Sequence, residues 1–129
     1  MASLLLNPII FNHIDFIDAL SRLARRSRLP EIRIIICDAR ALIDNNHRIL
    51  PLSHRLTSKI KLRKLTIDPI DEKEFILIDY DKLWLQHKPE EMLGFANYAA
   101  AAEVKNLQVV FEDLWKNSVE DPSLRQLLL

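Results

Sequence analysis

The sequence predicts an α/β domain whose mixed sheet carries helices on both faces. The first observation is the apolar run of residues 31–38 (EIRIIICD), which is rich in isoleucine. A strand that lacks polar alternation is buried on both faces and needs a helical layer on each side. The second observation is helical periodicity before this run and near the carboxyl end. The third is the length of 129 residues, 49% of them hydrophobic, which fits one domain over residues 1–129.

An amphipathic helix is predicted before the central strand. Asn12 is the expected N-cap, and Asp15 then falls at the third helical position, where a carboxylate is favourable. We expect the helix to end near Arg28, because Pro30 disfavours helical geometry at the residue before it. The apolar positions at helical spacing are Ile14, Ile17, Leu20, Leu23 and Ala24.

A short helix and a second strand are predicted after the central strand. Residues 38–46 are rich in turn formers, and the next helix should begin no earlier than His47, because Pro51 is tolerated only in a first turn. Residues 59–65 (KIKLRKL) alternate largely between basic and apolar side chains, which indicates a strand with one solvated face. The order strand, helix, strand predicts parallel pairing with the central strand.

The second half of the chain predicts a hairpin and a long helix. Two apolar strands are separated only by residues 80–81, which favours an antiparallel pair. The helix should run from Tyr98 to Asn117 with Asn97 as its cap. An apolar tail, residues 127–129, ends the sequence, and a tail of this kind usually docks on its own domain or on a second subunit.

Charge divides the sequence into two halves. Residues 1–64 hold twelve Lys/Arg against five Asp/Glu, a net charge of +7, whereas residues 65–129 hold six against thirteen, a net charge of −7. One hypothesis is a basic patch that follows phosphates, and the other is that two solvated faces neutralise each other. The pI near 6.9 favours the second hypothesis. The basic candidates are Arg22, Arg25, Arg26, Arg28, Lys59, Lys61, Arg63 and Lys64.

The single cysteine and the absence of long apolar runs indicate the compartment in which we expect the protein. Cys37 lies in the apolar run, so we expect an inert core thiol and no internal disulfide. Such cysteine usage fits a reducing cytoplasm. No stretch approaches the roughly 20 apolar residues that a membrane span requires, so no membrane association is expected.

The carboxyl end of the central strand is the candidate ligand crevice, because open α/β sheets bind ligands at that edge. Asp38 and Arg40 follow the strand, and His47 and Arg48 open the next helix. The structural alternative is that Asp38 is a turn or cap carboxylate and His47 a capping imidazole.

Metal and cofactor sites are not predicted. The four histidines, His13, His47, His54 and His87, are scattered along the chain without ligand-like spacing. A single glycine, Gly94, excludes phosphate-cradling loops of the Walker or Rossmann type.

The order of elements, with EIRIIICDAR, KIKLRK, EFILIDYDKLWL and GFAN, resembles one repeat of the phospholipase D superfamily. In that family a His-x-Lys-x4-Asp strand supplies the nucleophilic His, a phosphate-holding Lys and an Asp, followed by Gly-Ser-x-Asn. Setting the final Asp on Asp79 places Glu72 and Glu74 where His and Lys are expected. Gly94 and Asn97 keep the Gly and Asn of the second motif. The resemblance therefore implies a degenerate site, because two glutamates would repel a phosphate.

More closely, CDARALIDNNHRILPLSHRLTSKIKLR and FEDLWKNSVEDPSLRQLLL are similar to a small proteobacterial domain of unknown function, a degenerate phospholipase D-like module sometimes found after a GNAT-type acetyltransferase. In that family a strand precedes a Leu-Asp-Pro-like turn, which aligns with residues 6–8. We therefore expect the chain to lack the first strand of the repeat.

Two functions of different class follow. The main hypothesis is a non-catalytic, phospholipase D-like interaction module of unknown ligand, which either associates with itself or attaches to a partner such as an acetyltransferase. The apolar tail favours a homodimer, and the resemblance implies the acetyltransferase. The alternative is weak binding of nucleic acid or another phosphate-bearing ligand through the basic amino-terminal half. Enzymatic activity is disfavoured by the degenerate motif.

Overall fold

The central strand is β2 (Ile32–Ile36), and it is buried along its whole length as the sequence predicts. Ile34 and Ile36 expose only 1% and 2% of their surface. The strand belongs to a computed structural model that describes residues 2–6, 13–26, 32–37, 39–44, 47–67, 74–79, 81–88 and 93–124.

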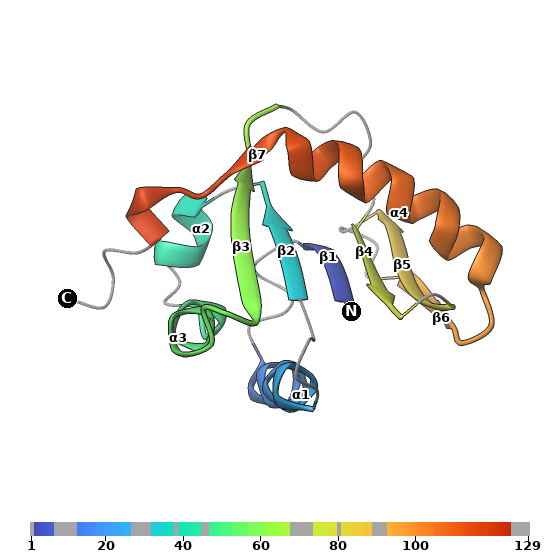
Figure 1. Ribbon diagram of the computed structural model, residues 1–129, viewed down its shortest axis with the longest axis horizontal. Helices are drawn as coiled ribbons and strands as arrows, with labels where there is room; N and C mark the ends of the chain where they lie inside the picture. Colours follow the sequence, from blue (N-terminus) through green and yellow to red (C-terminus); the bar gives the residue numbers. More distant parts are fainter. Residues whose placement is uncertain are drawn as a thin grey trace.

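Seven strands in the described part of the chain form one mixed sheet in the order β6-β5-β4-β1-β2-β3-β7 (Figure 1). β1, β2 and β3 are parallel to one another, and the other neighbours are antiparallel. The predicted parallel β2–β3 pair and β4–β5 hairpin are therefore confirmed. The remaining bounds are β1 (Ala2–Leu6), β3 (Ile60–Leu65), β4 (Glu74–Ile78), β5 (Lys82–Lys88), β6 (Leu93–Asn97) and β7 (Ser118–Val119).

The expectation that the first strand is missing is wrong. Ala2–Leu6 forms β1, which lies between β2 and β4 and pairs with both. Two hydrogen-bonded neighbours fix this short segment as an inner strand, which its local sequence alone does not reveal. The outer strands of the described sheet are instead β6 and the two-residue β7.

Helices cover both faces of the sheet (Figure 1). α1 (Ile14–Arg25), α2 (Ala39–Asp44) and α3 (Ile49–Arg55) pack on one face, and α4 (Ala101–Lys116) packs on the other. Side chains of β2 alternate between the two cores: Ile34 and Ile36 join the first, and Ile35 joins the second with Phe111 of α4. The predicted α/β class with helices on both faces is thus confirmed.

Capping decides where the helices begin. His13 rather than Asn12 is the N-cap of α1, and its Nδ1 accepts a hydrogen bond from the Asp15 N–H at 3.1 Å. α4 begins at Ala101, later than predicted, because the Asn97 side chain accepts from the Ala99 N–H at 2.9 Å and forms a local turn. α3 begins after His47, as the position of Pro51 predicts.

The segment after β2 differs from the prediction in two ways. Residues 39–44 form the helix α2, where the sequence indicated turns. Cys37 is exposed and not in the core, because β2 ends at Ile36 and the chain leaves the sheet there. Among the described residues, no helix has the length and apolar character needed to cross a membrane.

Candidate functional site

The described members of the predicted crevice, Arg40, His47 and Arg48, do not converge on a cavity. Arg40 is exposed on α2 and its Nε lies 3.7 Å from Asp44, one turn away. His47 is buried, and its Nδ1 accepts from the Ile49 N–H at 3.0 Å, which identifies a structural role at the start of α3. Arg48 is exposed, and Asp38 lies outside the described residues. Of these four residues, the three that the structure describes, Arg40, His47 and Arg48, line none of the three cavities near α1, α3 and α4.

The degenerate motif positions Glu74 and Asp79 lie at opposite ends of β4. Glu74 begins β4 and is buried beside the end of β1, because Phe75 pairs with Leu5. Asp79 follows the last residue of β4, in the left-handed region at φ 56°, which Asp tolerates better than most residues. Five residues of extended chain place them about 16 Å apart. Glu72 lies outside the described residues.

The two positions of the second motif are divided in the same way. Gly94 of β6 pairs with Gln86, which pairs with Glu74, so these three residues share one row across the sheet. Asn97 ends β6, is exposed and pairs with Leu83, near the edge that carries Asp79. The motif positions therefore form two separated groups.

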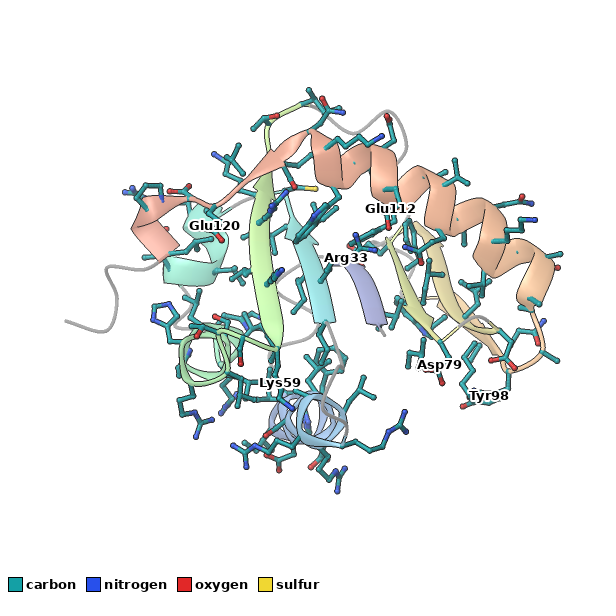
Figure 2. The ribbon with its side chains drawn as sticks, viewed as in Figure 1. Arg33, Lys59, Asp79, Tyr98, Glu112 and Glu120 are labelled. Atoms are coloured by element: carbon teal, nitrogen blue, oxygen red, sulfur yellow. The ribbon has the colours of Figure 1, made fainter. Side chains whose placement is uncertain are left out.

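A cluster of cations lies at the amino edge of the sheet, the edge where β1, β2 and β3 begin. α3 ends at Arg55 and leads directly into β3, whose first N–H bonds the Leu56 carbonyl at 2.8 Å. The start of β2 is tied to the same point, because the Ile32 N–H donates to the Lys59 carbonyl at 2.8 Å. Figure 2 shows Lys59 at the start of β3, between α3 and α1.

The last two turns of α1 bring three further cations to this edge. Arg22 and Arg25 belong to α1, and Arg26 is its C-cap. All three are exposed, and α1 contacts α3. Cations at helix C-termini interact favourably with the helix dipole, which explains their position without a ligand. We call Arg22, Arg25, Arg26, Arg55 and Lys59 the basic edge.

The arginines of the basic edge differ from other cations in their pairing. Within the described residues, Arg22, Arg25, Arg26 and Arg55 form no ion pair, whereas Arg33 is paired with Glu112 and Arg40 with Asp44. The other predicted patch members are dispersed. Arg63 packs over the Trp115 ring at 4.2 Å, Lys61 is exposed on β3, Lys64 is half-buried, and Arg28 lies outside the described residues.

A cavity of about 440 Å³ is lined by side chains of α1, β4 and β5, and we call it the α1–β4 cavity. Cations from two elements line it, namely Arg22 and Arg26 from α1 and Lys82 from β5. The Lys82 Nζ lies 3.2 Å from Asp81 and 3.5 Å from Asp79, and the hydrogen bond to Asp81 raises the pKa of Lys82. The apolar lining is Phe16, Ala19, Leu20, Leu23, Ile76 and Ile78.

Sequence reasoning missed this cavity. The spacing of Arg22 and Arg26, four residues apart on one helix face, was the available signal. The contact between α1 and the distant strand β4 was not encoded in any local pattern.

Two other cavities carry less convergent charge. One, of about 410 Å³, lies beside α3 and contains His54, whose Nε2 is 2.7 Å from the Leu124 carbonyl oxygen. The other, of about 710 Å³, runs along α4 and includes both acidic and basic side chains, among them Glu112 and Lys116. Within the described residues, no group of three or more His, Cys, Asp or Glu side chains could hold a metal ion.

These observations define a mixed α/β domain with a basic edge beside a small cavity. The chain belongs to the family described as Domain of unknown function (DUF7931), whose model matches residues 1–127. No curated protein matches the chain.

The fold is similar to that of TrmBL2, an archaeal chromatin protein whose structure is described as showing a novel mode of DNA binding, with a TM-score of 0.65 and 12% sequence identity. The similarity covers 93% of this chain and 45% of that one, so the chain spans less than half of the length of TrmBL2. At this identity the likeness concerns the fold alone.

Proposed function

We propose that this domain binds nucleic acid through the basic edge. The observation that carries the proposal is the set of four exposed arginines, Arg22, Arg25, Arg26 and Arg55, which form no ion pair within the described residues. Arginine binds phosphate through two parallel hydrogen bonds. These guanidinium groups lie at the carboxyl ends of α1 and α3, two helices in contact, and such a group of cations suits a backbone with regularly spaced phosphates.

The structural neighbour supports the same class of ligand. TrmBL2 is described as a DNA-binding chromatin protein, and its fold resembles this one over 93% of the present chain. The neighbour does not identify the contacting residues here, and the basic edge is our own assignment. Phosphate contacts carry no sequence information, so the expected binding is weak and insensitive to sequence.

Salt dependence tests the proposal. Each phosphate neutralised on duplex DNA changes the logarithm of affinity by about −0.9 per decade of salt. Four or five contacts should therefore give a slope of about −4. The measurement is fluorescence anisotropy of a labelled 20-base-pair duplex titrated with the full chain at several salt concentrations.

A matched pair of variants locates the contacts. Replacing both Arg25 and Arg55 by Ala should weaken binding and reduce the salt slope by about 2. The control replaces Arg40 and Arg48, two exposed arginines outside the basic edge, and removes the same charge. Equal losses in the two double variants, or a slope near zero in the unmodified protein, would overturn the proposal.

The more specific predictions from the sequence remain proposals, and we rank them below nucleic-acid binding. These are the phospholipase D-like repeat, a non-catalytic interaction module, homodimerisation, an acetyltransferase partner and a cytoplasmic location. If the domain is an interaction module, its affinity for a protein partner should change little with salt. Nucleic-acid binding through the basic edge should instead weaken steeply as salt rises.

A further inference from the structure

The α1–β4 cavity combines a cationic rim with an apolar wall, and it lies beside the basic edge. We propose that it receives one unpaired nucleotide of a single-stranded nucleic acid, with the phosphate at Arg22 and Arg26 and the base against the apolar wall. This proposal rests on the proposed function and narrows it from nucleic acid in general to single strands.

The rim fits a phosphate. Arg22 and Arg26 are four residues apart, so their side chains leave α1 on the same face, with Cβ atoms about 5–6 Å apart. Both are exposed, and both line the cavity. Lys82 adds a third cation from β5, on a different element from the arginines. Lys82 is itself ion-paired with Asp79 and Asp81, so a phosphate at this rim would meet its positive charge mainly from the two arginines.

The wall fits a base. Phe16, Leu20 and Leu23 of α1 and Ile76 and Ile78 of β4 supply the apolar lining of the cavity. Its volume of about 440 Å³ falls in the range of small-molecule sites. Contact between a base and an aromatic side chain typically strengthens single-strand binding by about tenfold or more. A paired base inside a duplex cannot enter such a cavity without leaving its stack.

Asp79 sets the orientation of the nucleotide. Its carboxylate lines the cavity 3.5 Å from the Lys82 Nζ and would repel a phosphate placed there. Figure 2 shows Asp79 at the end of β4. The phosphate therefore belongs at the arginine side, and Asp79 is placed to accept a hydrogen bond from a base amine or a sugar hydroxyl.

The test compares a labelled 20-nucleotide single strand with its duplex at one salt concentration. Charge alone favours the duplex, because its phosphates are denser. Occupation of the cavity should reverse this order, so the single strand should bind about tenfold more tightly than the duplex. Ala19→Trp should abolish the preference, because Ala19 is exposed, lines the cavity and can carry a bulky side chain without disturbing the core.

The control is Ile14→Trp, an exposed position on α1 that does not line the cavity and carries no charge. It should keep the preference. The inference is overturned if the unmodified protein binds the duplex more tightly than the single strand, or if the preference for the single strand survives Ala19→Trp. In either case, salt-dependent binding of the duplex would still support the proposed function. If the unmodified protein binds neither the single strand nor the duplex, both proposals are overturned.

A competition separates the base from other apolar groups with an anionic head. Deoxyadenosine monophosphate should displace the single strand from the unmodified protein and not from the Ala19→Trp variant. Octanoate also matches a cationic rim and an apolar wall. Displacement by octanoate without displacement by the nucleotide would assign the cavity to acyl anions and would overturn the inference.

Discussion

Arg33 of β2 and Glu112 of α4 join the sheet to the helix that covers it, through two parallel contacts (Figure 2). The Arg33 Nη1 donates to the Glu112 Oε2 at 3.0 Å, and Nη2 donates to Oε1. The guanidinium also lies over the Phe111 ring, 5.0 Å from its centroid. The Arg33 side chain is only 10% exposed, so Glu112 compensates a charge that has largely left water.

Removing Glu112 should therefore destabilise the domain. We expect Glu112→Ala to lower the free energy of unfolding by about 2 kcal/mol, because a hydrogen bond to a charged group is lost and Arg33 stays buried. Urea denaturation followed by Trp fluorescence measures this change. Asp113→Ala is the control, because it removes the same charge from the next, exposed residue and should change stability by less than about 0.5 kcal/mol. Equal effects of the two substitutions would contradict the assigned role of the ion pair.

The same ion pair predicts an acid dependence of stability. The hydrogen bond from Arg33 holds the pKa of Glu112 below its ordinary value of 4.5, and Gln108 contributes a second hydrogen bond. Because the pKa is lower in the folded state, the stabilisation is complete above pH 4.5 and is lost as the pH falls through the folded pKa. Unfolding curves at a series of pH values should show this loss.

A Glu112→Gln variant isolates this contribution. Its stability should fall less steeply on acidification than that of the unmodified protein. Some slope should remain, because hydrogen bonds from the Ser123 N–H and hydroxyl also lower the pKa of Asp121. A variant with an unchanged slope would show that Glu112 does not carry the acid dependence.

No hydrolysis of phosphodiesters above background is expected. Glu72 and Glu74 stand at the positions of the nucleophile and the phosphate-binding lysine, and Glu74 and Asp79 lie at opposite ends of β4. The measurement is turnover of a chromogenic phosphodiester by the pure protein and by an Asp79→Ala variant. Turnover that disappears in the variant would refute the interpretation of a degenerate site.

Homodimerisation is the remaining prediction from the sequence. An apolar tail at residues 127–129 and the hairpin around Trp84 are the expected contacts, with an interface of roughly 1,200 to 2,000 Å². Analytical ultracentrifugation of the full chain at tens of micromolar should show a dimer. A monomer at that concentration would rule the dimer out.

The structure determines where the tail can be removed in this experiment. Leu124 is a buried core residue and its carbonyl oxygen lies 2.7 Å from His54 Nε2, so truncation should follow Leu124 and spare Pro122–Leu124. A truncated chain that stays dimeric would assign the contact to the hairpin and not to the tail.

The sequence by itself determined the α/β class, the buried central strand, the strand at residues 60–65 and the β4–β5 hairpin. These features depend on periodicity and on short connections, which are local properties of the chain. The long helix was predicted as well, although its start shifted because Asn97 caps a local turn and not the helix.

Only the tertiary structure decided which distant residues meet. β1 became an inner strand through its pairing with β2 and β4, and Arg33, a charged residue in an apolar run, was accommodated through Glu112, 79 residues away. The basic edge and the α1–β4 cavity likewise depend on the contact between α1 and α3 and on the packing of α1 and β4 side chains around one core. Charge in a sequence shows how many cations a segment holds, but their partners and their shared edge are set by packing between elements that are remote along the chain.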